Sequence, residues 1–202
     1  MARRRDPEAQ RARRAAADAA DVLEAAARSL SGALRSRRSL EERLVAAGYP
    51  EAHVMAAVAR LAEIGLIDDE RYGKGLIEAR DRSRQRGDRA LLQELKRRGL
   101  DESLALRLLE ERSSVGGEPS PPLSGASRAD ETTPGEGAEE RAARSALSKI
   151  RLRGDDPRRE AQRVAHALAR RGFPSALAWR LARERVESEL RAEVADAEGT
   201  EE

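Results

Sequence analysis

The side chains with the clearest capacity for chemistry are basic. Residues 82–98 carry seven arginines and lysines against two acids, a local net charge of +5 in a chain whose total is only +2. Guanidinium and ammonium groups attract phosphates and carboxylates, and the attraction weakens as salt rises. Two more arginines stand in the register of Arg97 and Arg98 in a repeated segment described below. The set expected to bind an anionic partner is Arg82, Arg84, Arg86, Arg89, Lys96, Arg97, Arg98, Arg170 and Arg171.

For any single arginine, a solvated surface position is the simpler interpretation. The clustering, and its recurrence in repeat register, favour binding for the set as a whole. No aromatic residue lies among these basic residues, so the sequence does not predict base stacking or base-specific readout. We therefore expect an affinity for phosphates or for an acidic protein groove.

Other kinds of reactive site are not indicated. The chain has no cysteine, which excludes disulfides, thiolate nucleophiles and Cys-ligated zinc. Its two histidines, His53 and His166, have no serine or cysteine constellation around them in the sequence, and structural roles are expected for both. There is no G-x-x-x-x-G-K-[ST] loop for nucleotide phosphates. We expect no catalytic residue, no metal site and no cofactor, and a protein that is not an enzyme.

Composition limits the kind of fold. Of the 202 residues, 38% are charged and 2% aromatic, which leaves little bulky side-chain volume for one large core. Thin helical layers that pack leucine against alanine suit such a chain. No apolar segment follows the basic start, and no apolar run approaches the ~18 residues of a membrane span. We expect a soluble, cytoplasmic, monomeric protein.

Helix start and stop signals divide the first part of the chain. Asp18 precedes an apolar period that runs to about Leu34. Ser39 to Glu42 matches the S-x-x-E capping box, which predicts a helix start there. Pro50 suits the first position of the next helix, where no N–H donor is needed.

The segment from Ile64 to Gly73 predicts a tight corner between two helices. Gly65 can adopt the left-handed conformation that ends a helix, and the two apolar residues after it are expected to be buried. Asp68 or Asp69 can accept the first free N–H groups of the next helix, which Tyr72 continues. The expected role of these residues is geometric.

Three segments of the chain align without gaps. Each has a leucine, three residues, a glycine, a large apolar residue and a helix-starting residue, and the glycines are 51 and then 73 residues apart. The excess in the second spacing is close to the length of an acidic, proline- and glycine-rich stretch. The pattern predicts one three-helix unit used three times. The segments are Leu44–Pro50, Leu95–Asp101 and Leu168–Pro174, and their glycines, the repeat glycines, are Gly48, Gly99 and Gly172.

These signals predict an order of segments along the chain. Residues 113–140 carry six acids and one base, with helix breakers throughout, and read as disordered. The predicted organisation is a basic flexible arm at 1–16, three-helix repeats at 17–65 and 66–112, an acidic disordered linker at 113–137, a third three-helix repeat at 138–190 and an acidic tail at 191–202.

This order of elements resembles the RecX family of bacterial regulators of the RecA recombinase. The resemblance implies an all-α, elongated and curved array of three tandem three-helix repeats. It also implies binding in the deep groove of the RecA–DNA filament, which blocks filament growth, ATP hydrolysis, recombination and coprotease activity, with roles in DNA repair and the SOS response. The matching residues are Gly48-Tyr49, Gly65 to Tyr72, Arg86-Gly87, Glu94 to Gly99 and Leu168 to Phe173.

The favoured function is therefore regulation, mainly inhibition, of the RecA filament on single-stranded DNA, with at most a weak, salt-sensitive contact to DNA itself. The alternative is an autonomous helical DNA-binding protein that acts through the basic residues. That alternative predicts tight binding to naked DNA at physiological salt. A purely structural helical scaffold predicts neither behaviour.

Overall fold

The protein is built from α-helices. The computed structural model describes residues 7–114, 137–153 and 156–198, and the regular elements in these ranges are all helices, which confirms the predicted all-α class. A first helix precedes three groups of three. The bounds are α1 (Pro7–Ala15); the first group, α2 (Ala19–Ser31), α3 (Arg37–Ala46) and α4 (Glu51–Glu63); the second group, α5 (Asp69–Ser83), α6 (Asp88–Arg97) and α7 (Glu102–Ser114); and the third group, α8 (Ala138–Ser148), α9 (Pro157–Ala169) and α10 (Ser175–Glu198).

The chain divides into two compact units. One comprises Met1–Leu76 and Glu94–Ala105, and the other comprises Ile77–Gln93 and Leu106–Glu202. The first group of helices belongs to the first unit and the third group to the second. The division passes through α5, α6 and α7, so the second group contributes residues to both units.

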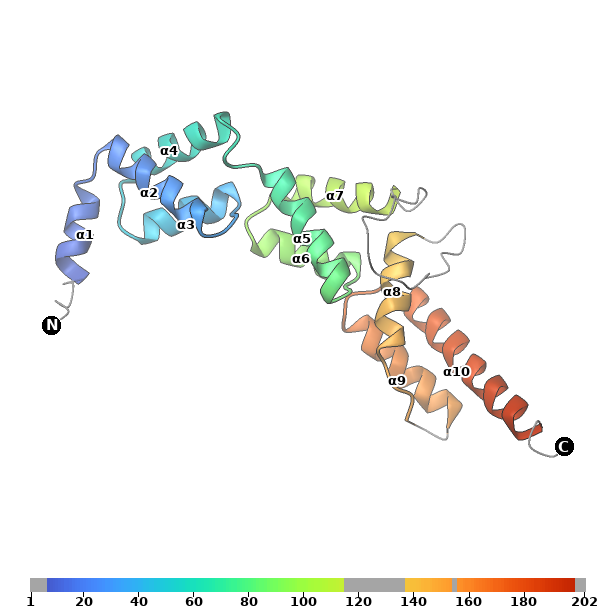
Figure 1. Ribbon diagram of the computed structural model, residues 1–202. Helices are drawn as coiled ribbons and strands as arrows, with labels where there is room; N and C mark the ends of the chain where they lie inside the picture. The colour runs from blue at the N-terminus through green and yellow to red at the C-terminus, as the bar shows by residue number, and fades with distance from the viewer. Residues whose placement is uncertain (1–6, 115–136, 154–155, 199–202) are drawn as a thin grey trace. The chain divides into compact units, whose positions relative to one another are not determined.

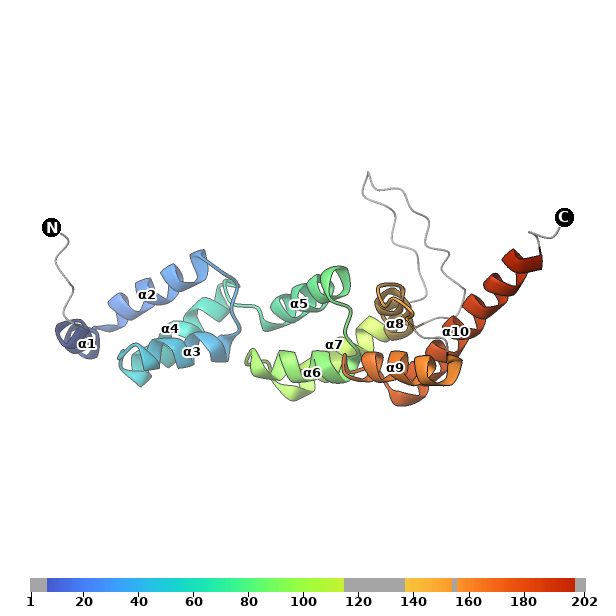
Figure 2. The ribbon, with the colours of Figure 1, turned by 90° about the horizontal axis from the view of Figure 1, so that it is seen from below.

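The first group has its own core. Its three helices stay together in both views (Figure 1 and Figure 2). Each buried leucine or valine contributes roughly 1.5–3 kcal/mol relative to an exposed one, and the apolar spacing of three and four residues aligns these side chains on one face of each helix. The fully or nearly buried members are Val22 and Ala26 of α2, Leu40 and Leu44 of α3, and Val54, Val58 and Leu61 of α4.

The third group packs small residues against large ones. α8 presents alanines, which let α9 and α10 approach closely, and Leu168 and Leu181 are fully buried between them. Phe173, 3% exposed, is the only phenylalanine of the chain and lies in this core. This is the leucine-on-alanine packing that the composition predicts.

The repeat glycines end their helices in the same way. Gly48, Gly99 and Gly172 have φ values of +100°, +85° and +89°, a region that residues with a Cβ resist. In each case the N–H of the following residue donates to the carbonyl five residues back, at 3.2 Å for Tyr49, 3.1 Å for Leu100 and 3.4 Å for Phe173. These are the bonds of a Schellman helix end.

Two predicted helix starts are displaced. The N-cap of α3 is Ser36 rather than Ser39, and the Ser36 hydroxyl accepts the Ser39 N–H at 3.2 Å. The capping-box prediction is wrong because Ser36 also has a bonding partner far away in sequence, described below. The sequence predicts Pro50 as the first residue of α4, but Pro50 is its N-cap, so the helix begins one residue later, at Glu51.

The N-terminal segment predicted as a flexible arm is helical over Pro7–Ala15. Arg14 of α1 donates to the carbonyl of Ala47 at 3.1 Å, and its guanidinium lies 5.7 Å from the centre of the Tyr49 ring. These contacts hold α1 on the end of the first group, which a local reading of charge could not reveal.

The C-terminal boundary also differs. α10 continues to Glu198 and so takes up most of the predicted acidic tail, because pairs four residues apart such as Arg185–Glu189 and Glu187–Arg191 support it. Of the predicted linker, residues 113 and 114 belong to α7 and residue 137 caps α8, while residues 115–136 lie outside the described part of the chain.

Candidate interaction surface

The first functional feature is a hydrogen bond that recurs at the carbonyl before each repeat glycine. The Ser36 hydroxyl donates to the Arg98 carbonyl at 2.5 Å, and the Gly87 N–H donates to the Arg171 carbonyl at 3.1 Å. Ser36 and Gly87 are themselves 51 residues apart, the spacing of the first two repeat glycines. We call the contact at Arg98 the first junction and the contact at Arg171 the second junction.

Both junctions bring main chains into close contact. A Cβ on Gly99 would lie 2.8 Å from the Ser36 hydroxyl, and a Cβ on Gly172 would lie 2.5 Å from the Ala90 Cβ. At the second junction the partner is also a glycine, and a Cβ on Gly87 would lie 2.2 Å from the Gly172 carbonyl oxygen. Larger residues at these positions would separate the elements that meet there.

A carboxylate completes each junction. Asp69 accepts the N–H of Arg37, the first residue of α3, at 2.7 Å, and Glu139 accepts the N–H of Asp88, the first residue of α6, at 2.8 Å. Each satisfies an N–H that a helix start leaves without an intrahelical partner. Burial raises the pKa of Asp69 and of Glu139, and the hydrogen bonds that they accept oppose the rise.

The predicted corner therefore divides its tasks between its two aspartates. Gly65, at φ +73°, ends α4, and the Leu66 N–H donates to the Leu61 carbonyl at 2.9 Å. Asp68 caps α5 by accepting the Arg71 N–H at 2.9 Å, whereas Asp69 reaches α3 as described above. Tyr72 is half-buried on α5. Of the two apolar residues expected to be buried, Ile67 is, while Leu66 is 55% exposed.

The predicted basic residues fall into two clusters, one at each junction. The first basic cluster consists of the predicted Lys96, Arg97 and Arg98 at the end of α6 and of Arg37 and Arg38, outside the predicted set, at the start of α3. The two ends meet because the Ser36 hydroxyl bonds the Arg98 carbonyl and Gly99 lies against Ser36 and Arg38. Most of its charges have carboxylate partners in the described chain: Arg37 with Glu41 at 3.2 Å, Arg38 with Glu42 at 2.8 Å, Lys96 with Glu102 at 2.7 Å and Arg98 with Glu94 at 3.9 Å; Arg97 also has a partner.

The second basic cluster joins the segment between α5 and α6 to the end of α9. It contains Arg84, Arg86, Arg89, Arg170 and Arg171, together with Arg82 in the last turn of α5. Arg82, Arg84, Arg89 and Arg170 are exposed and form no salt bridge with any residue that the structure describes. Arg86 has a partner. The two clusters thus differ in the charge that they leave available.

Not every predicted arginine is available for binding. The Arg171 guanidinium is half-buried and donates to the Ala146 carbonyl at the end of α8 at 3.0 Å. Its contact is structural and ties α9 to α8. The prediction from register alone missed this, since Arg98 at the equivalent position is exposed.

The sequence did not predict the buried ion-pair role of Arg112 of α7. Its side chain is 6% exposed, and its guanidinium binds both oxygens of Asp81, at 2.8 and 3.1 Å, and also the Asp88 carboxylate. Burial raises the pKa of Asp88, and the Arg112 charge opposes the rise. Nothing local in the sequence distinguishes Arg112 from its exposed neighbours, because its partners lie 31 and 24 residues away.

The histidines take part in packing contacts. His53 Nδ1 lies 3.2 Å from the Ala17 carbonyl, and the His166 ring meets Trp179 edge-on at 6.4 Å between centroids. Within the described ranges, no cluster of three His, Asp or Glu side chains has metal-binding geometry. No described helix is long and apolar enough to cross a membrane.

The chain is similar in sequence to members of a known protein family. Residues 68–109 match the family model "RecX, second three-helix domain". The chain is 32% identical over 165 residues to the regulatory protein RecX of Thermobifida fusca, covering 80% of this chain and 77% of that one. It is 29% identical over 163 residues to the regulatory protein RecX of Streptomyces coelicolor, covering 80% and 76%.

Solved structures agree on the fold. The crystal structure of RecX from Lactobacillus salivarius superposes with a TM-score of 0.64 at 17% identity, covering 86% of this chain and 97% of that one. A second crystal structure of a regulatory protein RecX gives a TM-score of 0.59 at 21% identity, covering 78% and 71%. With the helical architecture and the relatives named as regulatory proteins, the chain belongs to the RecX family.

Proposed function

We propose that this protein binds RecA filaments on single-stranded DNA and lowers their ATPase, recombinase and coprotease activity. Membership of a family of regulatory proteins supports a partner rather than a substrate. The observation that carries the proposal is the second basic cluster, which keeps four exposed arginines without a salt bridge to any described residue. An unpaired guanidinium can engage phosphate or carboxylate without first breaking an internal ion pair.

The proposal narrows the contact from the nine predicted residues to four. Arg82, Arg84, Arg89 and Arg170 supply the attraction, while the first basic cluster mainly neutralises its own carboxylates. Surface pairs of this kind contribute about 0–1 kcal/mol each, so their role is to hold local structure. The protein acts as a cytoplasmic monomer, and contact with DNA itself is weak and salt-sensitive.

The test follows ATP hydrolysis by RecA on single-stranded DNA as the protein is added. The wild type is expected to inhibit at near-stoichiometric amounts. A triple change of Arg84, Arg89 and Arg170 to alanine should weaken inhibition about tenfold or more and flatten its dependence on salt, because fewer charge contacts remain for salt to screen.

The matched control is a triple change of Arg37, Arg38 and Lys96 to alanine. It removes the same formal charge from paired positions and should alter inhibition far less. Equal losses in the two variants would show that net charge alone matters and would remove the second cluster as the contact. No inhibition by the wild type, together with tight binding to naked DNA at physiological salt, would favour the autonomous DNA-binding alternative.

A further inference from the structure

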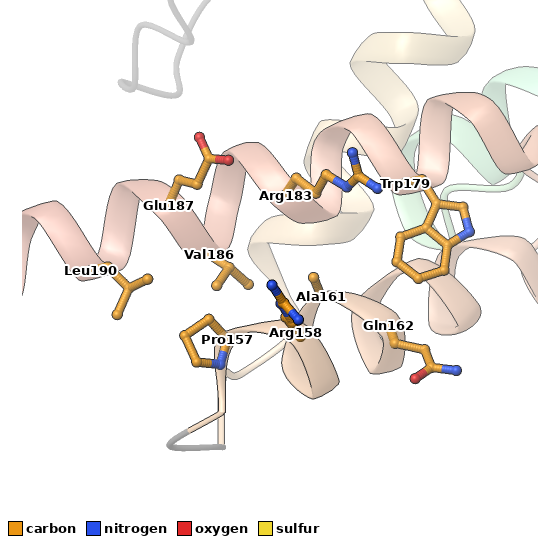
Figure 3. A pocket seen from close by; sticks show the side chains of 9 residues that line it. All are labelled: Pro157, Arg158, Ala161, Gln162, Trp179, Arg183, Val186, Glu187 and Leu190. Atoms are coloured by element: carbon orange, nitrogen blue, oxygen red, sulfur yellow. The ribbon is translucent and has the colours of Figure 1, made fainter.

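The third group of helices has an open groove between α9 and α10. It encloses about 490 Å³ and has an apolar floor that includes Ala161, Val186 and Leu190. Figure 3 shows Val186 and Leu190 of α10 pointing toward Pro157 of α9. The large aromatic ring of Trp179 closes one end and is 36% exposed.

The rim of this groove is cationic. The Arg183 guanidinium lies 5.9 Å from the centre of the Trp179 ring, and Arg158 stands at the start of α9. Neither forms a salt bridge with a residue that the structure describes, whereas the rim acid Glu187 is paired with Arg191 at 3.6 Å. The groove therefore offers apolar surface beside two unpaired positive charges.

A second groove lies between α6 and α7, within the same compact unit. It encloses about 670 Å³, with Leu92 and Leu109 on its floor and Leu106 exposed at its edge. Its rim carries one arginine, Arg89, and two acids, Asp88 and Glu110, so the two grooves share their apolar residues but not their charge. Six of its lining positions recur in the third-group groove 73 residues later, the spacing of Gly99 and Gly172. The pairs are Asp88 with Ala161, Arg89 with Gln162, Leu106 with Trp179, Glu110 with Arg183, Ser113 with Val186 and Ser114 with Glu187.

The exposed apolar residue at this position recurs a third time. Met55 of α4 precedes Leu106 by 51 residues, the spacing of Gly48 and Gly99. The exposed fractions are 56% for Met55, 45% for Leu106 and 36% for Trp179. A single exposed large apolar side chain needs no explanation. Recurrence of such a residue at one register of each third helix indicates a repeated contact.

We propose that these positions bind one recurring segment of a protein partner, presented by successive subunits of a polymer. Each segment would place a bulky apolar side chain against the exposed apolar residue of one helix group. At the third-group groove, a carboxylate of the segment would face Arg158 and Arg183. An exposed apolar residue repeated at one register of the chain matches a ligand repeated along a polymer. This inference rests on the proposed function and names the surface by which the chain recognises the RecA subunits of the filament.

Nucleic acid is the less suitable occupant. Base stacking needs an aromatic or planar side chain, and only Trp179 of the three register positions has one. Methionine and leucine bury aliphatic surface, which suits a protein side chain. A protein ligand uses all three positions in the same way.

The experiment replaces the three register residues together, Met55→Gln, Leu106→Gln and Trp179→Gln, in the full chain. The changes are at exposed positions, and retained helicity and thermal stability would show that the fold is intact. The matched control replaces three exposed apolar residues outside the grooves, Leu34→Gln, Val45→Gln and Leu66→Gln. Inhibition of RecA ATPase on single-stranded DNA and binding to naked single-stranded DNA are measured for both.

The groove variant is expected to inhibit filaments about tenfold or more less well than the wild type, because buried apolar anchors dominate interface energetics. Its binding to naked DNA should be unchanged, and the control should inhibit like the wild type. A wild type that inhibits and a groove variant that inhibits equally would overturn this inference alone. A wild type without effect on filaments would overturn the proposed function and this inference together.

Two further outcomes identify other occupants and would also overturn the proposal. Loss of naked-DNA binding in the groove variant would indicate that the grooves hold nucleic acid. Self-association of the wild type in sedimentation, abolished by the groove variant, would indicate a second copy of the chain.

Discussion

The two junctions show how one contact can be built with different chemistry. In both, a helix start meets the turn at a repeat glycine, a carbonyl accepts a bond and a carboxylate covers the first free N–H. At the first junction a serine hydroxyl supplies the bond to Arg98, while at the second the Gly87 main chain supplies it to Arg171. Ser36 donates through its side chain and so carries a Cβ at the first junction. Gly87 donates through its main chain, and a Cβ on it would clash with the Gly172 carbonyl.

The register position of Ser36 and Gly87 has a third member, Glu160, in the last group of helices. Glu160 follows Gly87 by 73 residues and is 5% exposed. It accepts the Arg153 N–H at 2.9 Å and binds the Arg163 guanidinium at 2.5 Å. Ser36 and Gly87 each bond to the turn that ends a helix of the next group, whereas Glu160 bonds to residues of its own group. Residues at one register therefore connect the first group to the second and the second to the third, and the last of them stabilises the third group internally.

The largest effect is expected from replacing Gly87 at the second junction with serine, the residue that Ser36 supplies at the equivalent position of the first junction. Gly87→Ser would place a Cβ 2.2 Å from the Gly172 carbonyl oxygen, and such overpacking costs about 3 kcal/mol. Urea unfolding measures the loss. The control is Gly75→Ala on α5, where nothing lies within 4 Å of an added Cβ and a neutral or slightly stabilising effect is expected. Equal stability of the two variants would mean that the second junction yields without cost.

A smaller loss is expected from removing the donor of the first junction. Ser36→Ala removes both the bond to the Arg98 carbonyl and the acceptor of the Ser39 N–H at a fully buried position. The expected cost is about 2 kcal/mol in the free energy of unfolding. Ser31→Ala removes an exposed hydroxyl that bonds Arg28 and should cost less than ~0.5 kcal/mol. The hydroxyl of Ser36 has no special role if both changes cost the same.

The third position should respond to pH. The hydrogen bond from Arg163 holds the pKa of Glu160 below its usual 4.5, so Glu160 contributes stability that is present above pH 4.5 and lost as the pH falls below it. Glu160→Gln should cost about 1.5 kcal/mol at pH 7 and much less at pH 3. Thermal unfolding across that range tests this, and a cost independent of pH would contradict it.

The smallest effect is expected from neutralising a junction carboxylate while keeping its oxygen. Burial raises the pKa of Glu139 above 4.5, so the folded protein takes up a proton first, and this group adds stability as the pH falls toward 4.5. Glu139→Gln retains the acceptor for Asp88 and should change stability at pH 7 by less than ~0.5 kcal/mol. Its acid unfolding should be steeper than that of the wild type.

Glu139→Ala leaves the Asp88 N–H without its carboxylate and should cost about 1 kcal/mol at pH 7. The same pair of changes at Asp69, to asparagine and to alanine, tests whether the two junctions titrate alike. Equal losses for Glu139→Gln and Glu139→Ala would show that the charge, rather than the hydrogen bond, holds the second junction.

Local signals in the sequence were sufficient for the helix ends. Gly48, Gly65, Gly99 and Gly172 all have positive φ, and a helix begins directly after Asp18, because these preferences depend on neighbouring residues alone. The misplaced cap at Ser39 and the unexpected α1 have another origin. Ser36 and Arg14 act on carbonyls 62 and 33 residues away, and no local pattern encodes such a partner.

The candidate binding residues show the same limit. Charge clustering in the sequence found the basic residues at both junctions but could not separate those with partners from those without. Arg170 and Arg171 are adjacent and identical in type, yet one is exposed and the other donates to Ala146. The sequence analysis did not predict the apolar register of Met55, Leu106 and Trp179, because only the structure shows that all three side chains are exposed.

The acceptor at the end of each second helix has a consequence for how such a chain can change over time. The carbonyls of Ala47, Arg98 and Arg171 receive a guanidinium, a hydroxyl and a main-chain N–H respectively. A main-chain oxygen is present whatever side chain the residue carries, so mutation at the acceptor cannot delete it. At the residues that form the bond, only the donor must be kept or replaced, and three donors of unlike chemistry already serve. Substitutions can therefore accumulate at the accepting residue, though not at the repeat glycine that follows it, while the helices continue to meet in the same way.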